Sequence, residues 1–398
     1  MNTLEQLKSY GIEIDAKTIE ANKSKHVICG MSGGVDSSVS ALLLKLMGYQ
    51  VTGIFMRNWQ EIDEHGKCSA EEDYKDVIAV CEKIGVDYYS LDFSNEYKES
   101  VFANFLVEYK MGHTPNPDIL CNREIKFKVF YDKAMELGAD YLATGHYCQT
   151  DGKKLIKGLD KNKDQSYFLY AIDGEVLKNV LFPIGILEKK VVRQIAHDFD
   201  LATKAKKDST GICFIGERNF KEFLSKYIKS QKGVFVHIET NKVLKAHDGA
   251  CFYTKGQRKG LGIGGPGGPF FVVDKDIKTN TVYVAEGEDH PALYAKELIA
   301  NELTWIEAEP SFPLRCKAKV RYRQSDQDCT VTKLSDGEIK VVFDENQRAI
   351  TERQSVVFYD GANCLGGGII DSVGDTLFTN SDRHLDQAFS EQPERPSL

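Results

Sequence analysis

A glycine-rich segment near the start of the chain combines residue types that bind phosphate. Residues 30–37 have the sequence Gly-Met-Ser-Gly-Gly-Val-Asp-Ser, between a short apolar run at 27–29 and a helical pattern that begins beside Asp36. Glycines let backbone amides approach an anion, the hydroxyl groups of Ser32 and Ser37 add donors, and a helix N-terminus adds positive potential. Because Asp36 would repel bare phosphate, we expect it to help hold a Mg2+ ion that bridges the phosphates of a nucleotide.

The alternative interpretation of this segment is a tight turn between a strand and a helix. A glycine pair alone would favour the turn, whereas the full Ser-Gly-Gly-Val-Asp-Ser string in this context favours nucleotide binding. The string lacks the Gly-x-x-x-x-Gly-Lys-[Ser/Thr] pattern of P-loop ATPases. It resembles the pyrophosphatase loop of enzymes that split ATP to AMP and pyrophosphate. That resemblance implies adenylation of a carbonyl oxygen, followed by displacement of AMP by a nucleophile.

Cys121, in the string Asn-Pro-Asp-Ile-Leu-Cys-Asn, is a candidate nucleophile. Pro115 and Pro117 stiffen the approach, and we expect Asn122 to cap the helix that follows a loop at 113–122. Cys121 would then lie just before a helix N-terminus. There the thiolate, which is the reactive form of cysteine, is favoured.

Cys213 is a second candidate thiol. It lies between Gly211 and Gly216 on a predicted short turn or strand with the sequence Gly-Ile-Cys-Phe-Ile-Gly. Three basic residues precede it, namely Lys204, Lys206 and Lys207. Their positive charges would favour an anionic sulfur.

For the other cysteines we predict small buried apolar side chains, or, as a separate hypothesis, metal ligands. The buried interpretation covers Cys29, Cys81, Cys148, Cys251, Cys316, Cys329 and Cys364. Metal binding fits poorly, because no Cys-x-x-Cys occurs and because His65 with Cys68, or His146 with Cys148, makes at best half a site. We therefore expect no protein-bound metal centre.

The pattern up to about residue 147 supplies a scaffold for these candidates. Short apolar runs alternate with helical periodicity, which is typical of a doubly wound parallel sheet in an α/β fold. Strands are expected at 27–29, 51–56, 86–93 and 141–144, and helices at 36–47, 69–84, 97–111 and 127–137.

The composition changes near residue 233, where glycine becomes dense and helical periodicity fades. After residue 298, alternating or β-branched runs are separated by Asp-Gly pairs, which predicts a small antiparallel β-barrel or sandwich. The end of the chain is polar and aperiodic, so we expect a disordered tail. The predicted division is a nucleotide-binding domain at 1–225, a middle domain at 226–297, a C-terminal β-barrel at 298–378 and a tail at 379–398.

Length and composition limit the class of protein. The 398 residues exceed what one core usually organises, so two or three domains are expected. With 42% hydrophobic and 28% charged residues the composition is that of a globular protein, and no apolar run approaches the roughly 18–20 residues of a membrane span. Scattered cysteines without a secretory signal favour reduced thiols and a cytoplasmic location.

Five motifs together resemble the bacterial tRNA-specific 2-thiouridylase family. They are the glycine loop, the Asn-Pro-Asp-x-x-Cys-Asn segment, Ala-Thr-Gly-His-Tyr at 143–147, Lys-Asp-Gln-Ser-Tyr at 163–167 and Gly-Ile-Cys-Phe-Ile-Gly at 211–216. The resemblance covers residues from about 26 to 360. It implies an adenine nucleotide alpha hydrolase-like domain and a tRNA-uridine 2-sulfurtransferase activity. In that family ATP adenylates the C2 oxygen of the wobble uridine U34, a persulfide delivers sulfur, and AMP leaves.

The resemblance also implies roles for matching residues. Cys213 would carry the persulfide and Cys121 would be the nucleophile, and a disulfide between them would absorb the oxidising equivalent. Asp118 would accept or orient a proton. The positions that match ATP contacts are Gly30, Met31, Ser32, Gly33, Gly34, Val35, Asp36, Ser37, Met56 and Gly145. Those that match the target-base segment are Asn116, Pro117 and Asp118, and those that match other tRNA contacts are His146, Lys163, Asp164, Gln165, Arg321, Tyr322 and Gln354. A packed histidine at 146 and a core methionine at 56 remain open alternatives.

The implied ligands are ATP with Mg2+ and tRNAs of the Glu, Gln and Lys type, and the implied protein partner is a sulfur-relay protein or cysteine desulfurase. We expect a monomer that does not bind membranes, with a middle domain that binds tRNA. The net charge of −8 gives no general attraction to nucleic acid. A run of alternating basic residues would nevertheless place five positive charges on one strand face, namely Arg315, Lys317, Lys319, Arg321 and Arg323. Such a run is usually a solvated face, but without an acid nearby it favours contact with tRNA phosphates, as does the basic loop at 255–260.

Two other functions stay open. A different adenylating ligase or amidotransferase, such as a relative of GMP or argininosuccinate synthetases, would share the glycine loop but need no pair of thiols. A tRNA-binding protein that senses ATP without chemistry would release no pyrophosphate. The first 25 residues and the tail match no family motif.

Overall fold

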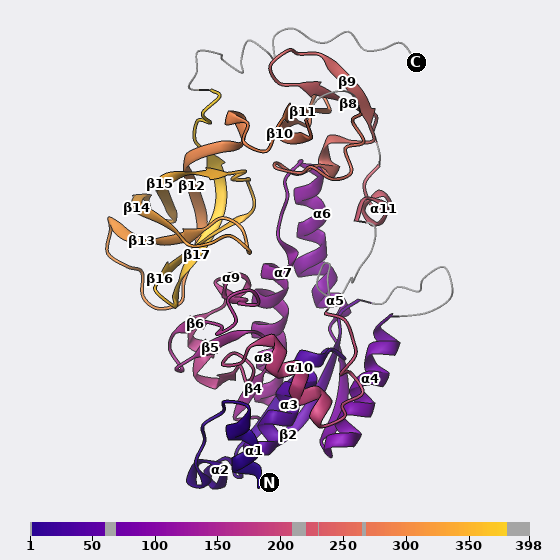
Figure 1. Ribbon diagram of the computed structural model, residues 1–398, viewed down its shortest axis with the longest axis vertical. Coiled ribbons are helices and arrows are strands. Elements are labelled where there is room, and N and C mark those ends of the chain that lie inside the picture. Colours follow the sequence, from indigo (N-terminus) through magenta and orange to yellow (C-terminus); the bar gives the residue numbers. More distant parts are fainter. Residues whose placement is uncertain (1, 60–68, 209–219, 230, 265–267, 380–398) are drawn as a thin grey trace.

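The first part of the chain folds around a parallel β-sheet in the computed structural model, which describes residues 2–59, 69–208, 220–229, 231–264 and 268–379 (Figure 1). The sheet has the order β3-β2-β1-β4-β7, and neighbouring strands are parallel throughout. Its strands are β1 (His26–Met31), β2 (Gln50–Arg57), β3 (Asp87–Asp92), β4 (Tyr141–Ala143) and β7 (Val180–Leu181). The predicted parallel sheet is confirmed.

Helices cover both faces of this sheet, because successive side chains of a strand point to opposite faces. Cys29 of β1 packs in a cluster with α3 (Val35–Leu46) and α4 (Ser69–Ile84). Its neighbour Ile28 packs in a cluster on the other face that includes α8 (Phe130–Glu136). Burial on both faces explains why β1 is almost continuously apolar, and it confirms the doubly wound arrangement.

Two helical runs between β3 and β4 each contain a π-helical stretch. The first consists of α5 (Ser94–Tyr97), η1 (Lys98–Phe102) and α6 (Ala103–Lys110), and the second of α7 (Pro117–Leu120), η2 (Cys121–Val129) and α8. The first run confirms the helix predicted over 97–111. The second begins earlier than predicted, because Pro117 suits a first helical turn and the Asn116 side chain accepts a hydrogen bond from the Asp118 amide at 3.2 Å. The expected loop over 113–122 is therefore wrong from residue 117 onward.

The C-terminal part is the predicted antiparallel barrel. Its strands are β12 (Tyr294–Trp305), β13 (Leu314–Lys319), β14 (Gln327–Ser335), β15 (Glu338–Arg348), β16 (Ser355–Asp360) and β17 (Asn363–Val373). They pair in the order β12-β15-β14-β13-β16-β17, and the pairing of β12 with β17 closes the barrel. The sheet also extends from β17 through β6 (Leu155–Lys157) to β5 (Cys148–Thr150), so a hairpin of the first part joins the barrel wall.

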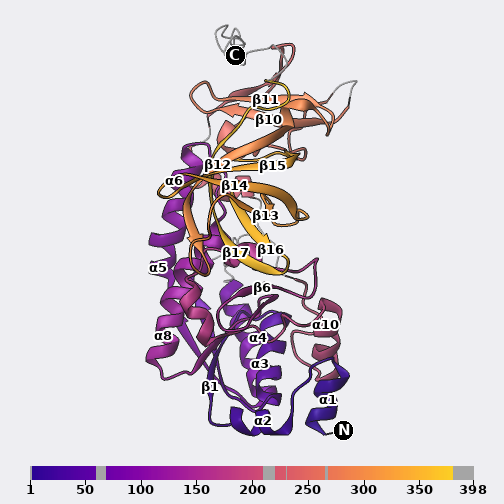
Figure 2. The ribbon, with the colours of Figure 1, turned by 90° about the vertical axis from the view of Figure 1, so that its left-hand side faces the viewer.

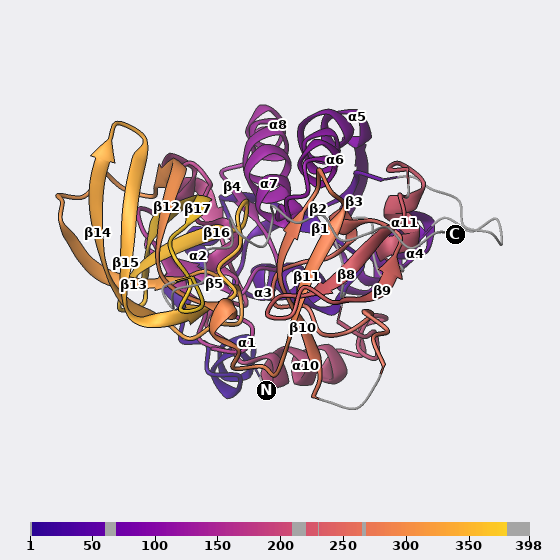
Figure 3. The same cartoon turned by 90° about the horizontal axis from the view of Figure 1, so that it is seen from above.

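Between these parts in sequence lies a smaller sheet of order β10-β11-β8-β9. It is made by β8 (Gly233–His237), β9 (Val243–His247), β10 (Phe270–Asp276) and β11 (Thr281–Glu286). The parallel sheet and this sheet lie at opposite ends of the long axis, and α6 runs from one toward the other (Figures 1 and 2). The barrel lies to one side of both (Figure 3).

The shorter elements complete the path. They are α1 (Thr3–Ser9), α2 (Ala16–Asn22), α9 (Ser166–Leu169), η3 (Gly174–Asn179), α10 (Lys189–Asp198), α11 (Phe220–Ser225), η4 (Ala250–Phe252) and η5 (Pro291–Leu293). Leu7 of α1 is buried in one cluster with Val192 and Ile195 of α10, so the N-terminal segment packs on the first part. In the described ranges no helix is long and apolar enough to cross a membrane. The exact domain limits stay predictions, and residues 380–398 of the predicted tail lie outside the described residues.

Candidate active site

The glycine loop lies where the order of the parallel sheet reverses. Residues 32–34 connect the carboxyl end of β1 to α3, and β1 has β2 on one side and β4 on the other. Ligands of open parallel sheets bind at such a switch point. Gly145, which follows β4, borders the loop so closely that a Cβ atom there would lie 2.8 Å from the amide nitrogen of Ser37. Two segments predicted to contact ATP are therefore neighbours in the fold.

The conformation of the loop requires glycine and exposes helix amides. Gly33 has φ +72°, and a Cβ atom on it would lie 2.4 Å from the carbonyl oxygen of Asp73 in α4. The Ser32 amide donates to the Ser37 hydroxyl oxygen at 3.1 Å, and the two hydroxyl oxygens are also 3.1 Å apart. Both side chains therefore lie at the N-terminus of α3. Gly34 is the N-cap of α3 and brings no side chain to satisfy the first-turn amides. This arrangement fits an anion such as a nucleotide phosphate.

Gly30 and Met56 form one border of this region. A Cβ atom at Gly30 would lie 3.2 Å from the Phe130 ring and 3.9 Å from the Met56 methyl group. Met56 lies near the carboxyl end of β2 and is buried. Its side chain belongs to the apolar core, so the core interpretation holds in this state, while contact with ATP stays a prediction.

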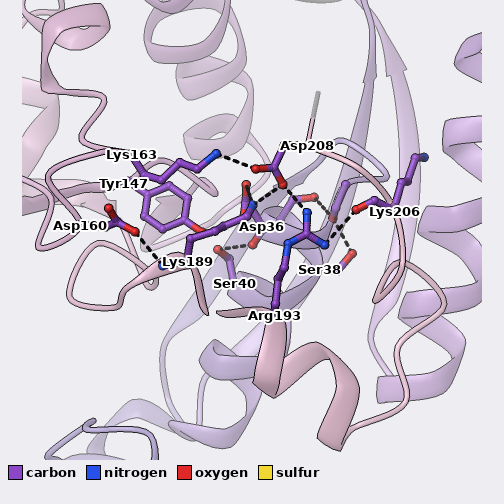
Figure 4. A network of polar contacts seen from close by, with 12 residues as sticks. Asp36, Ser38, Ser40, Tyr147, Asp160, Lys163, Lys189, Arg193, Lys206 and Asp208 are labelled. Atoms are coloured by element: carbon purple, nitrogen blue, oxygen red, sulfur yellow. Dashed lines mark hydrogen bonds and ion pairs between the residues drawn. The ribbon is translucent and has the colours of Figure 1, made fainter. Parts of the chain in front are cut away.

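The carboxylate of Asp36 is held by two side chains from outside the loop (Figure 4). The Lys189 ammonium donates to both oxygens, at 2.6 and 2.8 Å, and the Tyr147 hydroxyl donates to one of them at 2.8 Å. Burial and the neighbouring Asp36 raise the pKa of Tyr147 well above its usual range, so this hydroxyl remains a donor. Asp36 is thus neutralised by Lys189 in this state.

A metal ion would find few ligands in this site. Among the residues that the structure describes, no group of three or more His, Cys, Asp or Glu side chains could hold one. Asp36 offers a single carboxylate that Lys189 already occupies. A Mg2+ ion would therefore have to arrive with the phosphates of its nucleotide, which is the mode expected for this ion.

Asp208 extends the same network. Its carboxylate accepts from Lys163 at 2.6 Å and pairs with Lys189 at 2.9 Å and with Arg193. Burial opposes ionisation, but the hydrogen bonds from Lys163 and Lys189 hold the pKa of Asp208 well below its usual range. Lys163, predicted to contact tRNA, is here an ion-pair partner.

Cys121 occupies a different helical position from the predicted one. It has helical backbone angles (φ −61°, ψ −42°) between α7 and η2, in the interior of a continuous helical run, and it is fully buried. Asn122 does not cap a helix, because its side-chain oxygen accepts no hydrogen bond from the described residues, while its amide group donates to the Phe168 carbonyl at 3.0 Å. The expectation that Cys121 lies just before a helix N-terminus is wrong, since the capping residue is Asn116. Asp118 lies in the first turn after this cap.

Cys213 lies outside the described residues, as do His65 and Cys68. The lysines expected to favour an anionic sulfur at 213 already have acidic partners. Lys206 pairs with Asp73 and Asp76 of α4, and Lys204 pairs with Asp200. Whether these positive charges favour an anionic sulfur at Cys213 stays a prediction.

His146 is packed rather than exposed. Its ring lies between Phe127 and Phe182, with Nδ1 2.8 Å from the Thr144 hydroxyl. Burial, reinforced by nearby Lys126, lowers the pKa of His146 well below its usual range, so the ring is neutral. The interpretation of His146 as a packed histidine therefore fits this structure, and its contact with tRNA stays a prediction.

Asp164 and Gln165 point into the protein. Asp164 is buried and accepts from the amides of Gly158 and Ser166. Gln165 accepts from the amide of Tyr147 at 2.9 Å, which holds the residue that contacts Asp36. Both side chains support the network in this state.

Three predicted tRNA contacts of the barrel lie at its contacts with other parts of the chain. The Tyr322 ring packs against that of Phe168 in a tilted arrangement, with ring centroids 4.4 Å apart. Gln354 donates to the carbonyl of Thr114. Arg321 is half-buried, and desolvation lowers its pKa. It donates to the Lys255 carbonyl at 3.5 Å and, within the barrel, to the hydroxyl of Thr351 at 2.6 Å.

The predicted stripe of five unpaired cations is wrong. Strand β13 ends at Lys319, so Arg321 and Arg323 lie beyond it. The three cations on the strand pair with acids of other segments, as Arg315–Asp344, Lys317–Asp328 and Lys319–Asp326. These acids lie 7 to 29 residues further along the chain, so the local pattern did not reveal them.

Six of the seven cysteines predicted to be structural are buried, and Cys251 is half-buried. Burial raises the pKa of Cys81 to about 11 and that of Cys364 to about 12, so neither is a ready thiolate. This confirms the buried interpretation for Cys29, Cys81, Cys148, Cys316, Cys329 and Cys364.

The sequence analysis missed Lys189, Arg193 and Asp208. Lys189 and Arg193 are four residues apart in an amphipathic helix, so their shared face was a usable signal. Nothing in the local sequence places Asp208 between them, because that contact depends on the path of the chain after α10.

Comparisons with known proteins cover nearly the whole chain. Family models match as "tRNA methyl transferase HUP domain" at residues 25–217, "tRNA methyl transferase PRC-barrel domain" at 221–286 and "Aminomethyltransferase beta-barrel domain" at 295–370. A protein of Protochlamydia amoebophila named "tRNA-specific 2-thiouridylase MnmA" is 55% identical over 359 residues, which are 89% of this chain and 95% of that protein. A Bacillus subtilis protein of the same name is 54% identical over 353 residues, or 87% of this chain and 95% of that protein.

A distant likeness also exists among solved structures. The "U34-tRNA thiolase NcsA from Methanococcus maripaludis" is 18% identical with a TM-score of 0.34, over 56% of this chain and 70% of that one. This likeness is too weak to bear on function.

Proposed function

Because the chain belongs to the tRNA-specific 2-thiouridylase family, we propose that it is a tRNA-uridine 2-sulfurtransferase that uses ATP to replace the C2 oxygen of U34 with sulfur. The family models carry methyl transferase descriptions. The proposal follows the named relatives instead, which are more than half identical over nearly nine-tenths of the chain.

The observation that carries ATP use is the glycine loop at the sheet reversal. The amides of the first turn of α3, the two serine hydroxyls and the close approach of Gly145 support this proposal, because such an arrangement fits a polyphosphate. ATP bound there would supply the adenylate that makes the uridine C2 oxygen a leaving group. The loop would hold the phosphates, and Lys189 would offset the carboxylate of Asp36 beside them.

Sulfur transfer is assigned to Cys213 and Cys121. The terminal sulfur of a Cys213 persulfide would end on C2 as AMP leaves, either directly or after release as hydrosulfide. In both routes the Cys121 thiolate attacks Sγ of Cys213, the persulfide S–S bond breaks, and a Cys121–Cys213 disulfide forms. Since Cys121 is buried in this state, this step requires that its thiol become accessible.

The substrate contacts are extrapolated from family motifs. Asn116, Pro117 and Asp118 would meet the target base, with Asp118 orienting or accepting a proton. His146, Lys163, Asp164, Gln165, Arg321, Tyr322 and Gln354 would contact or support tRNA. A sulfur-relay protein or cysteine desulfurase would load Cys213, and the Glu, Gln and Lys tRNAs would be substrates of the monomer.

The proposal is tested with the full chain, ATP, Mg2+, unmodified tRNA and a sulfur donor. Nucleoside mass spectrometry should detect 2-thiouridine only when ATP is present. Cys121→Ala and Cys213→Ala should each abolish it. Full thiolation by either variant would exclude the two-thiol mechanism, whereas no 2-thiouridine from the unaltered protein under any of these conditions would exclude the function.

A further inference from the structure

An ion-pair cluster connects the glycine loop to the chain that leads to Cys213. Lys189 stands between Asp36 of α3 and Asp208, and Figure 4 shows its side chain directed toward both. Asp208 is the last residue that the structure describes before residue 220. The cluster therefore joins the start of α3 to the entry of the segment that carries the proposed persulfide.

The cluster is partly shielded from solvent, so salt screens its contacts less than those of surface pairs. The side chain of Lys189 is 11% exposed and that of Asp208 is 30% exposed. Three cations, Lys163, Lys189 and Arg193, surround the one carboxylate of Asp208. Ion pairs with little solvent between and around them are screened less by salt.

A second set of contacts fixes the same stretch of backbone. Arg193 donates to the Lys206 carbonyl at 3.1 Å, and the Lys206 ammonium donates to Asp73 at 2.7 Å. Asp73 is the residue whose carbonyl oxygen lies against Gly33 of the loop. Residues 206 and 208 are thus held beside the glycine loop by both α10 and α4.

We propose that Asp208 is a positioning residue for sulfur transfer, fixing the start of the Cys213 segment beside the nucleotide loop. The inference rests on the proposed function, since it assigns the sulfur to Cys213. Five residues of chain span at most about 18 Å, so the point at which Asp208 is held limits where a thiol at 213 can deliver sulfur. Lys189 also donates to both oxygens of Asp36, so we expect this contact, and the proposed adenylation beside it, to survive the loss of the Asp208 charge.

The test is the variant Asp208→Asn in the full-length protein, which removes the charge and keeps the side-chain shape. Two rates are measured with unmodified tRNA: pyrophosphate release, and single-turnover formation of 2-thiouridine from protein preloaded with sulfur by inorganic polysulfide. Pyrophosphate release should stay within about two-fold of the unaltered protein. Sulfur transfer should fall by about 10-fold or more, since misplacement of a reacting group by about 1 Å can cost about 100-fold. Asp208→Glu should recover part of the loss.

The matched control is Asp200→Asn, which removes the exposed ion pairs with Lys204 and Lys83 near the end of α10. It should leave both rates and the melting temperature unchanged. The proposal is overturned if Asp208→Asn transfers sulfur at the unaltered rate, or if both of its rates fall in proportion to a lowered melting temperature. Neither result affects the proposed function, which fails only if the unaltered protein forms no 2-thiouridine.

Discussion

At the scale of single residues, the glycine loop depends on the close approach of its backbone to neighbouring segments more than on its own side chains. Gly33 and Gly145 are positions where a side chain has no room, and each lies against backbone that cannot move aside cheaply. The sequence pointed to both through motifs. It did not point to Asp208, because the ion pairs of Asp208 join segments that are distant in the sequence, and the signal for Lys189, its shared helix face with Arg193, was overlooked.

Gly145→Ala tests the close approach. The added methyl group would lie 2.8 Å from the Ser37 amide nitrogen and 3.0 Å from the Asp36 carbonyl carbon, so the first turn of α3 must shift. We expect the KM for ATP in pyrophosphate release to rise at least about 10-fold, with a loss of stability of about 1–3 kcal/mol. Gly264→Ala, where no atom lies within 4 Å, is the matched control and should change neither quantity. An unchanged KM in the Gly145 variant would show that this contact does not shape the ATP site.

At the scale of elements, regular patterns were predictable and non-local ones were not. The strands of the parallel sheet and the barrel followed from apolar periodicity and turn residues. The hairpin β5–β6 was not predicted, since its partner strand β17 lies about 200 residues further along the chain. The helix start at Pro117 was misplaced because Asn116 and Asn122 have equal capping propensity, and only the fold selects Asn116.

His247, the last residue of β9 in the small middle sheet, should make the stability of the protein depend on pH. Burial lowers the pKa of His247 to about 4, and its Nδ1 accepts from the Gly249 amide at 3.0 Å. The unfolded chain, with a histidine pKa near 6.5, binds this proton more readily than the folded one. The stability that the neutral, buried His247 contributes is therefore fully present above about pH 6.5 and is lost as the pH falls from there toward 4.

His247→Asn keeps an acceptor for the Gly249 amide and removes the titrating group. In urea unfolding from pH 8 to 4, its free energy of unfolding should fall less steeply below pH 6.5 than that of the unaltered protein. The difference in slope is at most one proton, or about 1.4 kcal/mol per pH unit. Parallel curves for the two proteins over this range would refute the assignment.

At the scale of the whole molecule, the barrel meets the first part next to the cluster around Lys163. The Tyr322 ring packs against Phe168, and its hydroxyl donates to the Lys163 carbonyl at 3.4 Å. Five alternating cations suggested a tRNA-binding face, yet three of them pair with acids of other segments. Charge patterns read along one strand could not reveal partners on neighbouring strands.

Tyr322→Ala should loosen this junction without touching the glycine loop. We expect kcat/KM for tRNA thiolation to fall about 10-fold or more, since an aromatic contact is lost in addition to its buried area, while the KM for ATP stays within about two-fold. Tyr322→Phe, which keeps the ring, should retain most of the activity. Equal effects of the two variants on thiolation would assign the role to the hydroxyl group and not to the contact between the rings.

The adenylation of the uridine oxygen is the central claim, and an isotope transfer tests it most directly. A substrate tRNA labelled with 18O at C2 of U34 is thiolated in the presence of ATP, Mg2+ and a sulfur donor, and the released AMP is examined by mass spectrometry. The account predicts one 18O atom in the phosphate of AMP for each 2-thiouridine formed. Unlabelled AMP, with the 18O recovered in water or in pyrophosphate, would contradict it.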